Sequence, residues 1–201
     1  MSLPDSGRVE VGDTLRPTAR ALNGHGDSVA ATIVWARLDT TVQVVDSQTG
    51  ATVGLIGGQT GRIQARVGNL RSNPLTIAVQ SPLDSITRIG PRQSSVTVSG
   101  PPPDSLSDSL QVEAFTTPAG ALSQTGRTIA FTTTVYPGIG TTVTLVPRDT
   151  VTTNASGIAV VQVRYTGGPR PDSVVISASA RRHDGSVVPG TPVTFVVGFL
   201  P

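Results

Sequence analysis

Two histidines are the first candidates for chemistry in this chain of 201 residues, because imidazole ligates metals and transfers protons near neutral pH. His25 and His183 each lie in a stretch rich in glycine and aspartate, which is typical of a turn. A zinc site needs further ligands in a fixed geometry, and no cysteine, histidine or glutamate is spaced to complete one. We therefore predict that both histidines are exposed turn residues and that the chain has no metal site.

Asp104 and Asp108 are the next candidates, since clustered carboxylates are the ligands that calcium prefers. The nearby serines 105, 107 and 109 could add hydroxyl oxygens. Calcium takes about six to eight oxygen ligands, however, and two aspartates beside a proline-rich loop supply too few. We interpret these aspartates as solvated or turn-capping residues, with a calcium site near the domain junction as the alternative.

The residue types needed for catalysis are present but poorly arranged. Serine is plentiful, yet the chain has no Gly-x-Ser-x-Gly elbow, and neither histidine has a relay partner in the sequence. Both glutamates, Glu10 and Glu113, fall on predicted strands, which gives little support to a glycosidase carboxylate pair. The glycine-rich stretch 54–61 lacks the lysine and the following helix of a phosphate-binding loop. We predict no catalytic residues, no cofactor and a protein that is not an enzyme.

Trp35 and the pair Arg181-Arg182 could also bind ligands. The Trp35 indole could stack on a sugar ring, but its spacing from Ile33 places both side chains on one strand face. A β-sandwich buries its largest side chain on such a face, so we predict that Trp35 is in the core. Arg181 and Arg182 precede a turn, and we predict a solvated edge there that discourages edge-to-edge pairing.

The composition argues against several classes of protein. All basic residues are arginine, and they are scattered, with a formal net charge of only +2 and 3% aromatic residues. Nucleic-acid binding usually needs a clustered basic patch with stacking aromatics. No apolar run approaches the length of a membrane span, and the absence of cysteine excludes disulfides. The hydrophobic content of 37% is low, but its regular alternation favours a folded chain over disorder.

Short alternating strands separated by turns run from end to end and predict an all-β fold. In the stretch 151–163, a turn from Asn154 to Gly157 leads into a strand with alternate residues on one face. The same alternation predicts these inward-facing sets: Leu15, Ala19 and Ala21; Ile63, Ala65 and Val67; Leu75, Ile77 and Val79; Leu110, Val112 and Ala114; Ala159, Val161 and Val163; Val174, Ile176, Ala178 and Ala180; Val193, Phe195 and Val197. Val42 with Val45 and Val53 with Leu55 mark two further short strands.

A short junction at residues 81–85, Ser-Pro-Leu-Asp-Ser, separates two such series of strands. We predict two domains, residues 1–82 and 83–201, joined by a semi-rigid linker because the junction is short and contains a proline. The proline-rich stretch 100–104 cannot pair within a sheet. We interpret it as a loop of the second domain, with a domain boundary there as the alternative.

Several motifs of the first half occur in a recognisable order: Val11-Gly12-Asp13-Thr14-Leu15, Ile33-Val34-Trp35, Asp39-Thr40-Thr41-Val42, Val45-Asp46, Gly50, Gly57-Gly58 and Ile63-Gln64-Ala65. By these motifs, residues 8–80 resemble the group 2 type of bacterial immunoglobulin-like domains. The stretch 57–61 is longer than the usual turn of that family.

The second half carries the motifs 152–159 (Thr-Thr-Asn-Ala-Ser-Gly-Ile-Ala), 174–178 (Val-Val-Ile-Ser-Ala) and 192–195 (Pro-Val-Thr-Phe). By these, residues 105–198 resemble the group 1 type, which is repeated in invasin- and intimin-like adhesins. The aspartate-rich turn of that family is represented only by Thr117-Pro118-Ala119-Gly120. The resemblance implies two tandem immunoglobulin-like β-sandwiches. It transfers no binding residue, because all of these motifs are structural.

The resemblance also implies a function and a location. We expect a non-catalytic structural spacer or presentation module of an exported bacterial protein, in an extracellular, cell-surface or periplasmic position. The expected partners are neighbouring domains of a longer chain, which would also hold the signal peptide, and a host or glycan ligand. We expect a monomer without nucleic-acid binding or membrane insertion. The alternatives are a cell-adhesion or carbohydrate-binding module and an accessory domain of a secreted polysaccharide-degrading enzyme.

Overall fold

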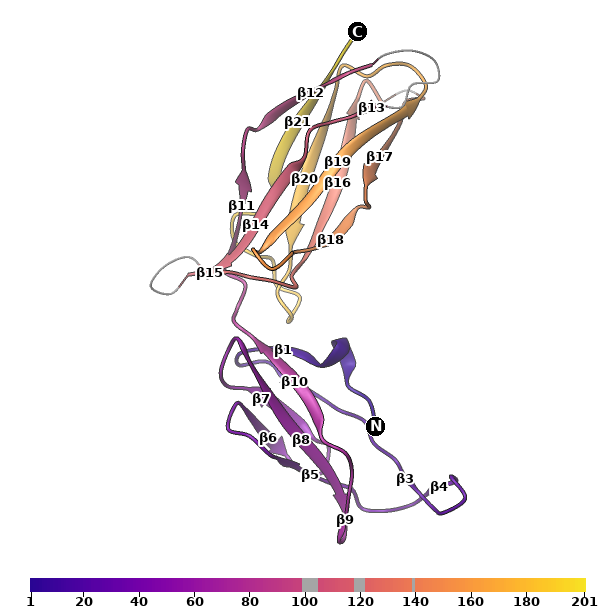
Figure 1. Cartoon of the computed structure of the whole chain (residues 1–201), viewed down its shortest axis with the longest axis vertical. Coiled ribbons are helices and arrows are strands. Elements are labelled where there is room, and N and C mark those ends of the chain that lie inside the picture. Colours follow the sequence, from indigo (N-terminus) through magenta and orange to yellow (C-terminus); the bar gives the residue numbers. More distant parts are fainter. Residues whose placement is uncertain (99–104, 118–121, 139) are drawn as a thin grey trace. The chain divides into compact units, whose positions relative to one another are not determined.

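The computed structural model describes residues 1–98, 105–117, 122–138 and 140–201. The chain divides into two compact units, Met1–Pro82 and Leu83–Pro201, each built of strands (Figure 1). Over the described ranges, the only helical segment is the 3₁₀ turn η1 (Pro4–Gly7). The predicted all-β fold is therefore confirmed.

The first unit contains two main sheets and a separate hairpin. One sheet has the strand order β1-β10-β8-β5, with β9 paired to β8, and the other has the order β2-β7-β6. The hairpin consists of β3 and β4. The strands are β1 (Arg8–Glu10), β2 (Thr14–Leu15), β3 (Ala21–Leu22), β4 (Ser28–Val29), β5 (Val34–Arg37), β6 (Val42–Asp46), β7 (Ala51–Gly54), β8 (Gln59–Val67), β9 (Leu70–Arg71) and β10 (Leu75–Gln80).

The core of the first unit lies between these sheets and includes Trp35, as predicted. Trp35 is only 4% exposed and packs with residues of both sheets, among them Leu15, Ile63 and Ile77. Gly50 lies directly against the indole, because a Cβ at this position would come within 2.8 Å of Trp35. Its φ of +75° is also a backbone conformation that residues other than glycine rarely adopt.

The predicted strand from Leu15 to Ala21 is divided in the structure. The alternation from Leu15 to Ala21 holds for burial, but β2 and β3 are separate strands because Pro17 has no N–H for the ladder. In β6, Val42 and Val44 lie on the inward face, and Val45, three positions from Val42, is 54% exposed on the other face. Leu55 is likewise exposed, because β7 ends at Gly54.

The second unit contains two larger sheets. The first has the order β11-β14-β19-β13, with β15 on β14 and β17 on β19, and the second has the order β12-β21-β20-β16-β18. The strands are β11 (Ser85–Ile89), β12 (Gln93–Thr97), β13 (Ser105–Leu106), β14 (Leu110–Thr116), β15 (Leu122–Ser123), β16 (Thr128–Tyr136), β17 (Thr142–Val146), β18 (Thr150–Thr152), β19 (Ile158–Gly167), β20 (Ser173–Ala180) and β21 (Val193–Leu200).

The predicted alternation in the second unit is confirmed on its longest strands. Strand β19 buries Ala159, Val161 and Val163, and β20 buries every second residue from Val174 to Ala180. These faces meet in one core to which both sheets contribute. The turn before β19 also forms as predicted, with Asn154 Oδ1 accepting hydrogen bonds from the backbone N–H groups of Ser156 and Ile158 at 2.9 and 3.0 Å.

The strand order of both units is that of an immunoglobulin domain, in which strands A, B, E and D face strands C, F and G. In the second unit, β11-β14-β19-β17 gives A-B-E-D and β16-β20-β21 gives C-F-G. In the first unit, β2-β7-β6 gives B-E-D and β5-β8-β10 gives C-F-G, with β1 added beside the last strand. The chain therefore consists of two tandem immunoglobulin-like β-sandwiches.

Candidate functional site

The two histidines considered for metal binding belong to different units. His25 is exposed in the turn between β3 and β4, and His183 is exposed in the turn after β20, in the other unit. Asp108 accepts a hydrogen bond from the Ser94 hydroxyl at 3.0 Å, whereas Asp104 and the proline-rich stretch 100–104 lie outside the described residues. In the part of the chain that the structure describes, no three His, Cys, Asp or Glu side chains form a group that could hold a metal ion.

The two glutamates also belong to different units. Glu10 is 3% exposed on β1, and Glu113 on β14 accepts a hydrogen bond from the Ser123 hydroxyl at 2.6 Å. The described segments contain no helix with the length and apolar character to cross a membrane.

In each unit, a strand near the start pairs in parallel with the last strand, and we call these the paired terminal strands. In the first unit the strand near the start is the first one, β1, and in the second unit it is β12, which follows β11. In the first unit, β1 pairs with β10 in the register Arg8↔Ala78 to Glu10↔Gln80. In the second, β12 pairs with β21 in the register Gln93↔Val196 to Thr97↔Leu200. Backbone hydrogen bonds extend both ladders, from Val11 to Gln80 and from Val98 to Leu200, each at 3.0 Å. Because these strands run in the same direction, the chain enters each unit at one end and leaves it at the other.

Side chains of the paired terminal strands reach into the cores. Val9 and Val79 are at most 2% exposed in the first unit. Val96 and Phe199 face each other in the register of the second unit and are 2% and 5% exposed. Phe199 also packs edge-to-face on Tyr165, with ring centroids 5.8 Å apart. Sliding the terminal strands past each other would therefore drag buried side chains as well as break hydrogen bonds.

Polar contacts fix the first residues of the second unit. Leu83 is 1% exposed, and the backbone N–H of Asp84 donates to the carbonyl oxygen of Phe115 at 3.1 Å. One carboxylate oxygen of Asp84 accepts hydrogen bonds from the Thr116 hydroxyl at 2.7 Å and from the Thr117 N–H at 2.9 Å. The start of the unit is therefore attached to the end of β14.

Arg182 completes this attachment from the opposite end of the sequence. Its Nε donates to the carbonyl oxygen of Leu83 at 2.9 Å, and its Nη2 lies 3.2 Å from the second carboxylate oxygen of Asp84. The hydrogen bond from the Thr117 N–H lowers the pKa of Asp84 from its ordinary value of 3.8, burial opposes this, and the Thr116 hydroxyl and the Arg182 charge lower it further. We call Leu83, Asp84, Thr116, Thr117 and Arg182 the junction cluster.

The prediction that Arg181 and Arg182 form a solvated edge was wrong for Arg182. Arg181 is exposed and donates to the Gly185 carbonyl oxygen at 2.8 Å, whereas the side chain of Arg182 is half-buried over Leu83 and Asp84. The partners of Arg182 precede it by 98 and 99 residues. No local pattern in the sequence indicates a contact over that separation.

No protein-family model and no curated protein sequence matches this chain. Among solved structures, it is similar to the Yersinia pseudotuberculosis adhesin InvE, with 17% identity, a TM-score of 0.47 and coverage of 98% of this chain and 57% of that one. It is also similar to the Escherichia coli adhesin FdeC (14% identity, TM-score 0.46, 99% of this chain, 63% of that one). A third similar structure comprises fibronectin(III)-like modules of Clostridium thermocellum CbhA (11% identity, TM-score 0.42, 98% and 93%). The chain thus spans little more than half the length of the two adhesin structures.

Proposed function

We propose that this chain is a non-catalytic structural spacer of a bacterial cell-surface or secreted protein. The observation that carries the proposal is the parallel pairing of the last strand of each unit with a strand near its start, β1 with β10 and β12 with β21. A domain that the chain enters at one end and leaves at the other adds its own length to the protein. It also transmits tension along that length.

The direction of the terminal strands determines how such tension acts. A pull on the two ends of the second unit loads β11 on its N-terminal side and, where it reaches β12, drives β12 and β21 along each other, so the hydrogen bonds from Gln93 to Thr97 resist together. A hairpin pulled apart at its open end instead loses its bonds one after another. The buried side chains Val96 and Phe199 add packing that must be lost in the same step.

The junction cluster supports the same role. Tension that arrives through the backbone at Leu83 meets hydrogen bonds to β14 and to Arg182 before it reaches β11. These contacts hold Leu83 and Asp84 within the second unit, and so they keep the connection between the units short. A short connection restricts the motion of a tandem pair.

The proposal includes the type and location of each domain. The sequence motifs support a group 2-like domain at residues 1–82 and a group 1-like domain at residues 83–201. They also support an extracellular, cell-surface or periplasmic location, in which the partners are neighbouring domains of a longer chain. In this role the monomer has no catalytic residue.

Single-molecule force spectroscopy tests the spacer role. The chain has no cysteine, so handles can be attached through introduced cysteines at chosen positions. Pulling on the two ends of the chain should give one unfolding event for each unit. The matched control carries Gln93→Cys and Val196→Cys, which are register partners, so force there separates β12 from β21 bond by bond. We expect end-to-end pulling to need several times the force of this control, and equal forces would contradict the proposal.

A further inference from the structure

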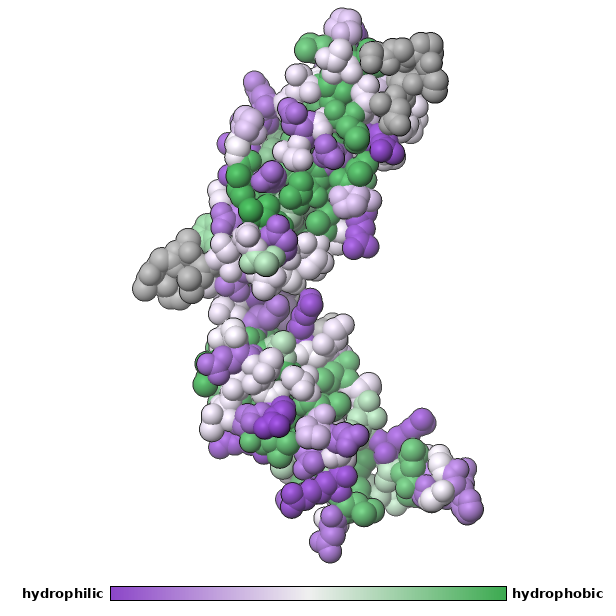
Figure 2. Space-filling model, in the orientation of Figure 1, coloured by the Kyte–Doolittle hydropathy of each residue, from purple (hydrophilic) through white to green (hydrophobic). Residues whose placement is uncertain are grey.

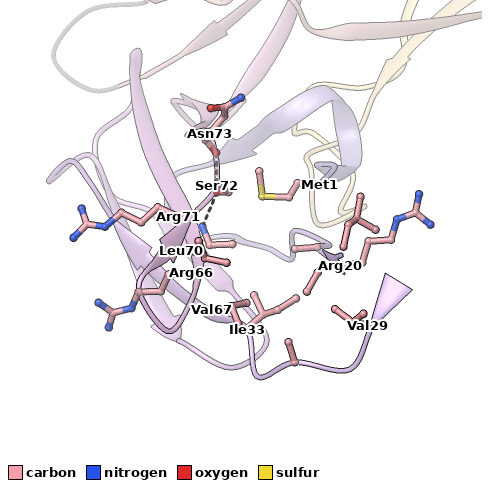
Figure 3. A pocket seen from close by; sticks show the side chains of 15 residues that line it. Met1, Arg20, Val29, Ile33, Arg66, Val67, Leu70, Arg71, Ser72 and Asn73 are labelled. Atoms are coloured by element: carbon pink, nitrogen blue, oxygen red, sulfur yellow. Dashed lines mark hydrogen bonds between the residues drawn. The ribbon is translucent and has the colours of Figure 1, made fainter. Parts of the chain in front are cut away.

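A groove of about 430 Å³ opens on the first unit, between the β3–β4 hairpin and the β8–β9 hairpin (Figure 3). Small and apolar side chains line it, including Ile33, Ala65 and Val67. Apolar residues also reach the surface beside it, near β9 and near the β3–β4 hairpin (Figure 2). Leu70 and Leu22 are 76% and 52% exposed there. Exposed leucines contribute little to the stability of the unit, and an apolar patch of this kind is typical of an interaction surface.

Arginines flank the groove on two opposite sides. Arg66 and Arg71 extend from one side and Arg20 from the other (Figure 3). Among the described residues, none of the three forms an ion pair. We call this feature the arginine-rimmed groove.

The arginines on the first side repel each other. Arg66 and Arg71 are direct cross-strand partners in the β8–β9 hairpin, and like charges in that position destabilise a sheet. The hairpin is held in this geometry by the Ser72 hydroxyl, which accepts a hydrogen bond from the Ala65 N–H at 3.1 Å. Folding therefore gains nothing from placing these two charges together, whereas an anionic ligand would gain from both.

Unpaired backbone borders the same groove. Residues 30–32 form no strand and make no backbone hydrogen bond to the other described residues. Ala31 and Ile33 line the groove, two positions apart, as alternate residues of an extended segment do. The N–H and C=O groups between them are available to an extended chain lying alongside.

We propose that the arginine-rimmed groove binds an extended acidic segment of another protein. The apolar side chains of the segment fill the groove, and its carboxylates meet Arg66 and Arg71 on one side and Arg20 on the other. Charge-assisted hydrogen bonds from arginine to carboxylate are about twice as strong as neutral ones. A single-headed amphiphile such as a fatty acid fits less well, because one carboxylate cannot reach both sides. This interaction goes beyond the spacer role and does not depend on it.

A labelled peptide with the repeat Glu-Val-Glu-Leu tests this proposal against the full chain. Fluorescence anisotropy should show saturable binding, and NMR should place the shifted resonances at Ala31, Val67 and Leu70. A matched peptide with Gln for Glu should bind at least about tenfold more weakly, and so should one with Ser for Val and Leu. Absence of binding at millimolar peptide, or equal binding of the Gln peptide, would overturn the proposal.

Two variants separate binding from folding. Arg71→Glu should raise the melting temperature of the first unit, because it replaces a repulsive cross-strand pair with an attractive one, yet weaken peptide affinity by at least about tenfold. Leu70→Ser should also weaken binding without unfolding the unit, since Leu70 is 76% exposed. The control Arg88→Glu changes an exposed arginine of the second unit and should leave the affinity unchanged. Equal affinity of all three variants would contradict the proposal.

Other occupants of the groove give different results. Dodecanoate that displaces the peptide at lower concentration than unlabelled peptide would indicate an amphiphile site. Sedimentation showing a concentration-dependent dimer that Leu70→Ser abolishes would indicate a second copy of the chain. Either result would overturn the assignment to an acidic segment.

Discussion

Arg182 and Leu83 are joined by a hydrogen bond of 2.9 Å from Nε to the carbonyl oxygen, although 99 residues separate them in the sequence. The same guanidinium lies 3.2 Å from the Asp84 carboxylate. Through these two bonds, the turn that follows β20 holds the first residues of the second unit. The junction cluster therefore combines the start of that unit, the end of β14 and a segment near the end of the chain.

Replacing Arg182 should destabilise the second unit. Arg182→Gln removes the charge and both bonds and leaves the Leu83 carbonyl oxygen without its donor. We expect a loss of about 1–2 kcal/mol in the free energy of unfolding, at the low end for a charged hydrogen bond because the side chain is partly exposed. Urea denaturation of the full chain measures it. Arg181→Gln is the matched control, and its exposed side chain predicts a change within about 0.5 kcal/mol.

The stability of the second unit should fall in acid through Asp84. The pKa of Asp84 is lowered in the folded state, above all by the hydrogen bond from the Thr117 N–H, so the folded state binds this proton less readily than the unfolded state does. Its contribution is complete above the unfolded pKa and is lost as the pH falls through the folded pKa. Urea midpoints between about pH 5 and about pH 2 should decrease less steeply in Asp84→Asn than in the parent chain. Asp184 has a lowered pKa too, so some slope should remain, but parallel curves would contradict this role for Asp84.

Gly50→Ala should destabilise the first unit strongly. The new Cβ would lie 2.8 Å from both Pro17 and the Trp35 ring, and the φ of +75° is itself unfavourable for alanine. We expect a loss of about 2–3 kcal/mol. Trp35 is the only tryptophan, so its fluorescence reports unfolding of this unit alone. Gly24→Ala provides the control, because a Cβ at that position would meet no atom within 4 Å and its effect should be small.

Local periodicity explains which parts of the fold could be predicted. The buried faces of β19 and β20 follow from alternation within each strand, and the position of Trp35 follows from its spacing to Ile33. The register shift between Val44 and Asp46 depends on pairing with β7, which alternation within β6 does not reveal. Pro17 is a local signal that would have divided the strand from Leu15 to Ala21.

The sequence predicts the candidate sites less completely than it predicts the fold. The sequence around Arg182 predicts a surface residue, and only the folded structure places its guanidinium beside Asp84. The arginine-rimmed groove likewise combines Met1 with segments around Ala21, Ile33 and Leu70 that share no motif. The parallel pairing of the terminal strands requires the strand order of the whole unit, because about a hundred residues separate β12 from β21 in the sequence.

Thr153 provides a final test, because its hydroxyl is buried and serves two backbone groups. The hydroxyl accepts a hydrogen bond from the Arg127 N–H at 2.8 Å and donates to the Gln124 carbonyl oxygen at 2.7 Å, and the residue is 4% exposed. Thr153→Val keeps the shape but leaves both groups without this partner, so we expect a loss of about 1–3 kcal/mol in the unfolding free energy of the second unit. Thr153→Ser retains the hydroxyl and should lose less, because only a methyl group is removed. Urea denaturation compares the two, and a smaller loss in Thr153→Val than in Thr153→Ser would show that the methyl group, and not the hydrogen bonds, stabilises the turn before β19.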